Sequence, residues 1–220
     1  MMRGMTPLLL FPFNGNAREA VGVVEAINKV SPTWDLLGFI DDDPDRGDCA
    51  QGNVPVLGSR SRLKDYPAAK LLAVPGRPEN YRHRLGIIDG LAVADDRFAT
   101  VIHPSAEIGP GCSIGTNVLI HAGVVLTVGV EIGRDVAILP NTVLSHDVCV
   151  GRGTLIGSGV TIAGGVQIRP SAYVGSGSRL LQDIVIGEEA LIGLGSTVIR
   201  SVEARAVVAG NPARTLRIQM

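Results

Sequence analysis

The most constraining feature of this sequence is an aliphatic residue that recurs every six positions through nearly half of the chain. A period of six would place successive aliphatics on different sides of an α-helix, and it lacks the two-residue alternation of a simple β-meander. The pattern therefore predicts a solenoid. No insertion interrupts the series, which runs Ile102, Ile108, Ile114, Ile120, Leu126, Ile132, Ile138, Leu144, Val150, Ile156, Ile162, Ile168, Val174, Leu180, Ile186, Ile192, Val198.

These hexapeptides predict a parallel β-helix in which each repeat supplies one short side and three repeats make one coil of about eighteen residues. The aliphatic side chain points inward, and a small or β-branched residue four positions later fills the narrow corner. A glycine that often follows the aliphatic relieves backbone crowding where the chain turns. The series accounts for between five and six coils, and the aromatic content of 4% suits so thin an interior. An irregular β-sandwich would instead show alternation and variable spacing.

Composition limits the other possibilities. The chain has 220 residues, of which 45% are hydrophobic and 19% charged, so a second, smaller unit can accompany the β-helix. A formal net charge of -1 indicates neither nucleic-acid binding nor attraction to an anionic membrane. No apolar run is long enough for a membrane span, and residues 1–5 lack a signal-peptide core, so we expect a cytoplasmic protein. Cys49, Cys112 and Cys149 indicate neither a disulfide framework nor a zinc site.

The first hundred residues differ from the repeats and predict a small α/β unit. Apolar runs and helical spacing alternate along this part of the chain, which favours a Rossmann-like parallel sheet with helices on its faces. We therefore expect an α/β domain over 1–100, the β-helix over 101–200, and a tail over 201–220 that completes or caps the helix. The expected strands are 8–13, 36–40 and 71–74, an apolar stretch at 54–57 leads to the third of them, and the expected helices are 17–30, 61–66 and 79–91.

Three loops of this α/β unit follow the carboxyl ends of its strands, where ligands bind in such sheets. They carry Asn14-Gly15-Asn16, Asp41-Asp42 and Gly76. A glycine turn at a helix start can present amide donors to a phosphate, and an acidic residue after the second strand can accept from a ribose or base. The absence of G-x-G-x-x-G disfavours a dinucleotide redox cofactor. The alternative is that the glycines only make turns and the acidic residues form a solvated loop.

Histidines are the candidates for chemistry in the repeats. His103 and His121 are eighteen residues apart, so they lie on adjacent coils. His146 is followed by Asp147, and Gly164 lies one coil further on. An exposed imidazole beside a carboxylate and a side-chain-free stretch of backbone is a candidate general base next to a slot for an extended ligand. The alternative is a solvated surface histidine.

Taken together, these features resemble the left-handed β-helix acyltransferases. The whole chain is similar to the bacterial group that includes sialic-acid O-acetyltransferases and nucleotide amino-sugar N-acetyltransferases. The resemblance rests on the unbroken hexads, on His146-Asp147, on the small domain that precedes the repeats, and on the ending Val207-Val208-Ala209-Gly210-Asn211-Pro212-Ala213-Arg214. It implies left-handed coiling, although the general crossover rule predicts the opposite hand.

The resemblance also implies roles for individual residues. It assigns His146 as the catalytic base and Asp147 as the neighbour that orients it. It places acetyl-CoA, without a metal, in a groove between subunits of a homotrimer, and a nucleotide sugar in the loops of the N-terminal domain. The positions that match the coenzyme groove are Gly164, Ser176, Leu194, Gly195 and, for the coenzyme phosphates, Arg214. The positions that match the nucleotide-sugar loops are Asn14, Gly15, Asn16, Asp41, Asp42 and Gly76.

Three departures from the family pattern bear on the acceptor. Leu139 stands where the family often has an asparagine seven residues before the histidine, and Leu155 stands where some members have a second histidine at the coenzyme site. The first loop, Phe11 to Asn16, lacks the usual glycine-rich form. The departures leave the expected chemistry intact and the identity of the sugar open.

The function that the resemblance implies is acetyl transfer from acetyl-CoA to the 4-amino group of a nucleotide-linked amino-deoxy sugar, a step in cell-surface polysaccharide, lipopolysaccharide or glycoprotein glycan biosynthesis. Cys149 has no adjacent base, so direct transfer is expected rather than an acyl-enzyme. The alternatives are O-acetylation of sialic acid or another sugar hydroxyl, a non-catalytic sugar-nucleotide binding protein, and a zinc-dependent γ-type carbonic anhydrase to which His103 and His121 would contribute. The nucleotide, the sugar and the use of other acyl groups stay open.

Overall fold

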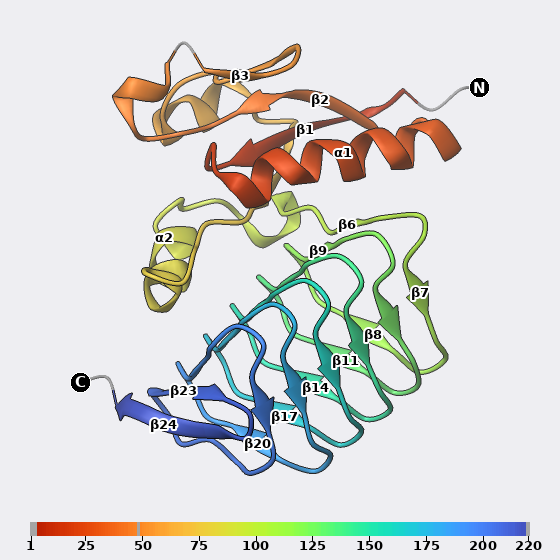
Figure 1. Cartoon of the computed structure of the whole chain (residues 1–220). Helices are drawn as coiled ribbons and strands as arrows, with labels where there is room; N and C mark the ends of the chain where they lie inside the picture. The colour runs from red at the N-terminus through yellow and green to blue at the C-terminus, as the bar shows by residue number, and fades with distance from the viewer. Residues whose placement is uncertain (1–3, 48, 219–220) are drawn as a thin grey trace.

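A computed structural model describes residues 4–47 and 49–218 of the chain, so the extreme ends of the first and last expected segments lie outside the described residues. A small sheet with one long helix lies against one side of a prism of stacked coils (Figure 1). Within the described ranges no helix is long and apolar enough to cross a bilayer.

The N-terminal sheet has three parallel strands, with β1 (Thr6–Phe11) between β2 (Trp34–Phe39) and β5 (Lys70–Ala73). Side chains of β1 alternate between two cores: Leu8 and Leu10 face α1 and the coils, and Leu9 faces the opposite side. The predicted small parallel sheet is confirmed. Its remaining short elements are η1 (Pro44–Arg46), β3 (Ala50–Gln51), β4 (Val54–Pro55), η2 (Arg60–Asp65), η3 (Tyr81–His83), α2 (Arg84–Asp89) and η4 (Asp95–Arg97).

Helix α1 (Gly15–Val30) follows β1 directly and presents an apolar face to the sheet and the coils. The side chain of Asn14 caps it by accepting a hydrogen bond from the amide of Ala17 at 2.9 Å. The helix ends at Ser31, whose backbone is extended. It therefore begins where the first strand's loop ends, which places its N-terminus at the carboxyl edge of the sheet.

Two helices differ from the sequence prediction, one in length and one in type. The segment 79–91 forms only the single turn η3 and the six-residue α2, and the segment 61–66 forms the 3-10 helix η2. Gly86 lies inside α2 and Gly90 closes its last turn by donating to the carbonyl of Gly86. Glycine is a weak helix former, which limits this helix to the turns that packing supports.

The repeats form a prism with three faces of short parallel strands. The first face is an eight-stranded sheet whose last two strands are longer than the others. It contains β6 (Val101–Ile102), β9 (Leu119–Ile120), β12 (Ala137–Ile138), β15 (Leu155–Ile156), β18 (Tyr173–Val174), β21 (Leu191–Ile192), β23 (Ala206–Gly210) and β24 (Ala213–Ile218). The second face contains β7 (Glu107–Ile108), β10 (Val125–Leu126), β13 (Val143–Leu144), β16 (Thr161–Ile162), β19 (Arg179–Leu180) and β22 (Thr197–Val198). The third face contains β8 (Ser113–Ile114), β11 (Glu131–Ile132), β14 (Cys149–Val150), β17 (Gln167–Ile168) and β20 (Val185–Ile186).

The coils pack around one continuous interior of aliphatic side chains, as the hexad pattern predicts. Residues eighteen apart are paired in parallel register, for example Leu126 with Leu144, and the amide of Val125 donates to the carbonyl of Thr142 at 2.9 Å. Thr142 and Val160 fill corners and are fully buried. The predicted parallel β-helix is confirmed.

Nearly every turn at a corner of the prism contains one residue with positive φ, three positions after the aliphatic. Glycine, asparagine and aspartate adopt this conformation most readily, and they fill nearly all of these positions. The glycine directly after an aliphatic has another role: a Cβ on Gly109 would lie 1.4 Å from the carbonyl oxygen of Thr127 on the next coil. The positive-φ positions include Gly111, Asn117, Gly123, Gly129, Asp135, Asn141, Asp147, Gly153, Gly159, Gly165, Ser171, Gly177, Asp183, Glu189 and Gly195.

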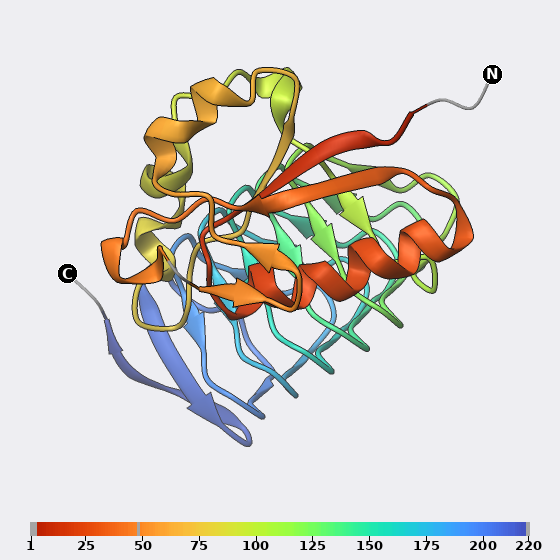
Figure 2. The same ribbon diagram turned by 90° about the horizontal axis from the view of Figure 1, so that it is seen from above.

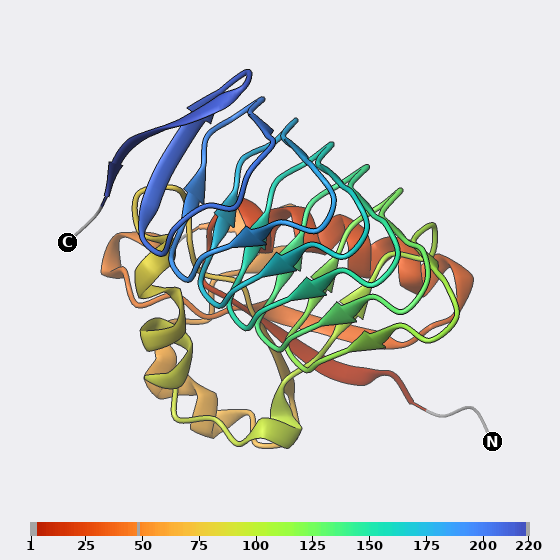
Figure 3. The same ribbon diagram turned by 90° about the horizontal axis from the view of Figure 1, so that it is seen from below.

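The N-terminal sheet and α1 lie over the first face (Figures 2 and 3). The outward residues of this face are apolar, whereas those of the second and third faces include Glu107, Arg179, Glu131 and Gln167. This period-eighteen apolar row is a sequence signal for the docking face that the hexad analysis did not use. The row consists of Val101, Leu119, Ala137, Leu155, Tyr173 and Leu191.

The inward aliphatic positions allow a direct stability test. Ile156 is 1% exposed, so Ile156→Asp buries an unpaired carboxylate and is expected to lower the free energy of unfolding by at least about 4 kcal/mol. Thr161→Asp is the matched control because Thr161 points outward on a neighbouring strand and is exposed. Chemical denaturation measures both variants, and similar losses for the two would contradict the assigned interior.

Candidate active site

A cavity of about 640 Å³ lies where the N-terminal loops meet the β-helix. The three loops that follow β1, β2 and β5 converge there, and all six residues that we expected to bind a nucleotide sugar line it: Asn14, Gly15, Asn16, Asp41, Asp42 and Gly76. The β-helix supplies the opposite wall, which is mainly apolar and consists of Leu139, Leu155, Ile156, Gly157 and Tyr173.

The two asparagines of the first loop tie the loops together. Asn14 donates from Nδ2 to the carbonyl oxygen of Val74 at 3.1 Å, and Asn16 donates to the carbonyl oxygen of Gly76 at 3.3 Å. The same Asn14 side chain caps α1. These contacts hold the start of α1 against the loop that follows β5, so the cavity entrance is shaped before any ligand binds.

The two aspartates are also engaged with their own chain. Asp41 accepts from the backbone amides of Phe13 at 2.7 Å and Asp43 at 2.8 Å. Asp42 accepts from the backbone amide of Arg60 and pairs with its guanidinium. Burial raises the pKa of Asp42, but the hydrogen bonds and charge of Arg60 outweigh it and hold that pKa below its usual 3.8. Both carboxylates therefore shape the loops, and only their remaining lone pairs can face a ligand.

The cavity has a positive end. Gly15 lies at the N-terminus of α1, where the first amides of a helix have no intrahelical partner and the helix dipole is positive. The exposed Arg77 lines the same cavity. A helix N-terminus and a guanidinium on one cavity suit an anionic group such as a phosphate.

His146 lies away from this cavity, on the corner between the second and third faces, which we call the second corner. Its Nδ1 is 2.9 Å from Oδ2 of Asp147, and its side chain is 68% exposed. Asp147 occupies the positive-φ position of the corner, with φ of 59°. The structure thus places an accessible imidazole against a carboxylate, with the Nε2 side of the ring free of that contact.

Gly164 lies one coil beyond His146 and leaves space for its ring. A Cβ built on Gly164 would lie 2.4 Å from Nε2 of His146, so any other residue there would displace the imidazole. The equivalent outward corner position in the other repeats is occupied by residues with side chains, such as Pro140, Ser158 and Leu194. Gly164 is the one glycine in this series between residues 104 and 200, which agrees with its selection from the sequence as the open position beside His146.

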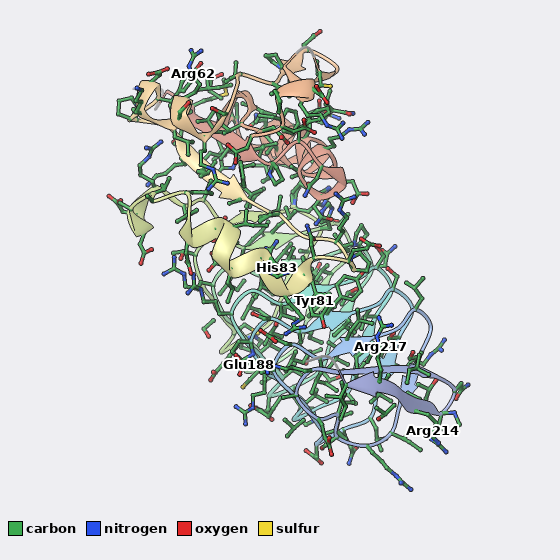
Figure 4. The ribbon with its side chains drawn as sticks, turned by 90° about the vertical axis from the view of Figure 1, so that its left-hand side faces the viewer. Arg62, Tyr81, His83, Glu188, Arg214 and Arg217 are labelled. Atoms are coloured by element: carbon green, nitrogen blue, oxygen red, sulfur yellow. The ribbon has the colours of Figure 1, made fainter. Side chains whose placement is uncertain are left out.

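The residues expected to bind the coenzyme fall into two groups. Gly164 accompanies His146, whereas Ser176, Leu194 and Gly195 stack along the corner between the first and second faces, which we call the first corner. The amide of Gly195 donates to the carbonyl of Ser176 at 2.9 Å, and Leu194 is 75% exposed. Arg214 is exposed on β24 at the C-terminal end of the prism (Figure 4).

One chain does not bring His146 to the cavity. The second corner touches the second and third faces, while the cavity borders the first face and the first corner. None of His146, Asp147 and Gly164 lines the cavity. A reaction that uses both the cavity and the imidazole therefore requires a second copy of the chain.

The other histidine pair has a different environment. His121 is 4% exposed, and its Nε2 is buried without a hydrogen-bond partner. Burial, together with nearby His103, lowers the pKa of His121 to about 4, so it is neutral at physiological pH. Among residues 4–47 and 49–218 of one chain, no group of three or more His, Cys, Asp or Glu side chains is placed to hold a metal ion.

Sequence reasoning missed two features near the cavity. One is its apolar wall, for which the period-eighteen row on the first face was an available signal. The other is Arg84, which is fully buried beside the cavity loop at Pro75 and contacts Asp135 on the β-helix. A single arginine on an expected surface helix gives no sequence signal of burial.

Comparison with known proteins agrees with this architecture. A family model described as bacterial transferase hexapeptide (six repeats) matches residues 98–127 and 129–164. No curated protein matches the chain. The resemblance of the repeats to bacterial hexapeptide transferases is therefore confirmed over the first coils.

Solved structures match almost the whole chain. PerB from Caulobacter crescentus, determined with CoA and GDP-perosamine, is 25% identical, with 98% of each chain covered and a TM-score of 0.81. The acetyltransferase domain of PglB from Neisseria gonorrhoeae is 22% identical, with 96% of this chain and 100% of that chain covered and a TM-score of 0.82. WeeI from Acinetobacter baumannii is 23% identical, with 96% and 100% covered and a TM-score of 0.66.

The repeats match the bacterial transferase hexapeptide family over part of the chain. The whole chain has the two-part fold of these solved structures, a small parallel sheet followed by a parallel β-helix. The comparisons also support the expected acyltransferase class.

The burial of His121 predicts a pH-dependent loss of stability. Its folded pKa of about 4 lies below the usual 6.5, so between these pH values the unfolded chain binds a proton that the folded chain does not. The free energy of unfolding should therefore fall as pH drops through this window, by on the order of 3 kcal/mol from this group. His121→Leu, which copies Leu139 on the next coil, should remove that part of the loss.

Urea titrations at pH 7 and pH 4 measure the effect. His83→Leu is the matched control, because His83 is exposed and is not among the groups that lower the pKa of His121. Equal acid sensitivity in the wild-type protein and His121→Leu would show that His121 is protonated without cost in the folded state.

Proposed function

We propose that this protein transfers the acetyl group of acetyl-CoA to the 4-amino group of a nucleotide-linked amino-deoxy sugar, with His146 as the general base. The observation that carries the proposal is the arrangement of His146, with Asp147 at Nδ1 and Gly164 beneath Nε2. The proposal draws further support from PerB, a perosamine N-acetyltransferase of the same fold that was solved with CoA and GDP-perosamine. Variants of that enzyme with a replaced histidine were solved with the same ligands.

The carboxylate of Asp147 can only accept a hydrogen bond, so it favours the tautomer of His146 with a proton on Nδ1. Nε2 then carries a lone pair on the open side of the ring. It takes a proton from the sugar amine as the amine nitrogen forms a bond to the thioester carbonyl carbon. The carbon–sulfur bond then breaks, and the thiolate, whose conjugate acid has a pKa of about 8.5, leaves and takes up the proton from the imidazolium or water.

Positioning and electrostatics supply the rest of the acceleration. Alignment of amine and thioester contributes on the order of 7 to 11 kcal/mol in well-oriented reactions. The amide of Gly165 already donates to the carbonyl of His146, so the amide of Gly164 is the candidate donor to the developing oxyanion. Small residues at this corner also leave the slot beside the imidazole open for an extended pantetheine chain.

The cavity is the proposed acceptor site. Its positive end at Gly15 and Arg77 suits the diphosphate of a nucleotide sugar, and its apolar wall at Leu139, Leu155 and Tyr173 suits the less polar face of a deoxy sugar. A free sialic acid would not need a site for a diphosphate. These features favour a nucleotide-linked acceptor. We therefore propose the amine of a nucleotide-linked amino sugar as the acceptor rather than a hydroxyl of free sialic acid.

A homotrimer with shared sites reconciles the separate positions of base and cavity. The cavity and first corner of one copy would face the second corner of the next, which brings His146 of a neighbour to the acceptor. Acetyl-CoA would then lie between copies, against Ser176, Leu194 and Gly195 of one and Gly164 of the other. Arg214 on β24 is the proposed contact for the coenzyme phosphates.

The test is a thiol-release assay with acetyl-CoA and a panel of UDP-, dTDP- and GDP-linked 4-amino-4,6-dideoxy sugars, with CMP-sialic acid and free sialic acid alongside. We expect turnover of one amino sugar and a loss of about 10² to 10⁴-fold in His146→Ala, since general-base catalysis contributes this much. The exposed side chain predicts an unchanged melting temperature. Unchanged turnover in His146→Ala would refute the assigned base.

The panel also separates the alternatives. Acetylation of sialic acid alone would retain the reaction class and replace the acceptor. Binding of nucleotide sugars without turnover of any acceptor, under conditions where CoA does not bind, would favour a non-catalytic binding protein.

A second variant tests the geometry of the imidazole without removing it. Gly164→Ala introduces a Cβ into the space of the His146 ring and should lower kcat by about 10²-fold, the cost of misplacing a catalytic group by about 1 Å. Glu188→Ala is the matched control, because the exposed Glu188 has the equivalent position on the corner between the third and first faces, away from both His146 and the proposed coenzyme groove. Equal kcat in Gly164→Ala and Glu188→Ala would show that the imidazole acts from another position.

A further inference from the structure

Arg84 is the largest fully buried polar side chain of the described structure, and the proposed reaction does not use it directly. It begins α2 and lies between the N-terminal loops and the corner that joins the third face to the first, which we call the third corner. Its guanidinium donates from Nε at 3.1 Å and from Nη2 at 2.7 Å to the carbonyl oxygen of Asp135. Its Nη1 donates to the carbonyl oxygen of Pro75.

The β-helix side of this contact is rigid. The carboxylate of Asp135 is fully buried and pairs with Arg152 at 2.7 Å and Arg134 at 3.2 Å, and it accepts from Asn117 at 2.9 Å. Asn117 also exchanges two hydrogen bonds with the backbone of Ala73 at the end of β5. The carboxylate of Asp135 would therefore still be paired with Arg152 and Arg134 if Arg84 were removed. The backbone carbonyl of Asp135, which accepts from Arg84, belongs to a corner that these contacts fix.

The other side of the contact is the cavity wall. Pro75 and Gly76 line the cavity, and Gly76 has φ of 115°, which L-residues rarely adopt. A Cβ on Gly76 would lie 3.0 Å from Cδ1 of Leu155, so the backbone is pressed closely against the β-helix. The far end of the same segment is fixed as well, because the hydroxyl of Tyr81 donates to the carbonyl of Glu189 at 2.6 Å. Figure 4 shows Tyr81 and His83 beside the last coils, with Glu188 below them.

We propose that Arg84 is a positioning residue that holds the Pro75–Gly76 wall of the acceptor cavity against the β-helix by joining the carbonyls of Pro75 and Asp135. A planar guanidinium can satisfy both carbonyls at once, which an ammonium cannot do with the same geometry. Burial lowers the pKa of Arg84 to about 10, against the favourable charge of Asp135, so the side chain remains a cation at neutral pH. A buried cation is costly for stability, which favours a role in fixing a specific geometry.

The inference rests on the proposed function in one respect, namely that the acceptor occupies this cavity. His146 lies on a different corner, so loss of Arg84 should affect acceptor binding and leave the chemical step intact. Arg84→Gln is expected to raise KM for the acceptor about tenfold, with kcat and KM for acetyl-CoA each within about twofold of wild type, the pattern of lost uniform binding.

Arg134→Gln is the matched control. Arg134 also pairs with Asp135 and joins it to the N-terminal domain, but its partner there is Asp95, whereas the partner of Arg84 is the carbonyl of Pro75 in the cavity wall. The control should leave KM for the acceptor within about twofold of wild type. Equal increases in KM for the two variants would show that Arg84 only attaches the N-terminal domain to the β-helix, and would overturn the proposal. A fall in kcat without a change in KM would also overturn it.

Hydrogen exchange tests the same role without any substrate. The amides of Arg77, Asn80 and His83 are hydrogen-bonded within the cavity segment, and they should exchange at least about tenfold faster in Arg84→Gln but not in Arg134→Gln. Unchanged exchange would overturn the proposal even if no acceptor is found. If exchange is faster in Arg84→Gln but the wild-type protein turns over no acceptor, the positioning role is supported and only the proposed function is contradicted.

Arg84→Lys keeps a cation beside Asp135 and serves if the glutamine variant does not fold. It should show the same faster exchange and higher KM, because the ammonium cannot reproduce the planar arrangement of donors that joins both carbonyls. Wild-type exchange and KM in a folded Arg84→Lys would show that charge alone suffices and would overturn the proposed two-carbonyl contact.

Discussion

The strict six-residue register of the coils is the constraint on which the rest of the structure depends. Because every residue lies directly above the one eighteen positions earlier, a change at one outward position is felt by one neighbour on each adjacent coil. The register places Gly164 next to His146, and the missing side chain of Gly164 leaves space for the imidazole ring. It also aligns the apolar row of the first face, on which the α/β unit packs. The corners enforce the register with positive-φ positions that glycine, asparagine and aspartate fill at little steric cost.

The sequence predicted the β-helix because its period is local, uninterrupted and unlike that of any other architecture. The three cavity loops were also predictable, since the carboxyl ends of parallel strands share one edge of a sheet. The short length of α2 was not predictable, because tertiary packing and Gly86 outweigh apolar spacing. The His146-Asp147 pair alone is weak evidence for catalysis. Asp147 has a positive φ, which favours aspartate at this turn position whatever its neighbour, as at Asp135 and Asp183. Only its 2.9 Å contact with His146 supports a role in orienting the ring.

The fold divides the proposed chemistry between places that a single chain keeps apart. A rigid prism cannot bend to bring its second corner to a cavity on its first face, so the acceptor cavity and the base belong to different copies in the proposed assembly. Different contacts fix the cavity loops and the imidazole in position. Asn14, Asn16 and Arg84 fix the cavity loops through backbone carbonyls, and Asp147 fixes the imidazole. The polar groups that sequence reasoning assigned to the ligand thus also hold the site in shape.

Activity in mixed assemblies of two inactive variants tests most directly whether the base and the cavity of one site come from different copies. His146→Ala removes the base, and Gly15→Glu blocks the cavity with a carboxylate at a helix N-terminus, where a Cβ meets no other atom and a negative charge is tolerated. If each complete site takes its base and its cavity from different copies, co-refolded mixtures contain some sites with both parts intact. We predict that these mixtures regain roughly a quarter of wild-type turnover per site, from random pairing of copies. Mixtures that assemble but remain as inactive as either variant alone would contradict it.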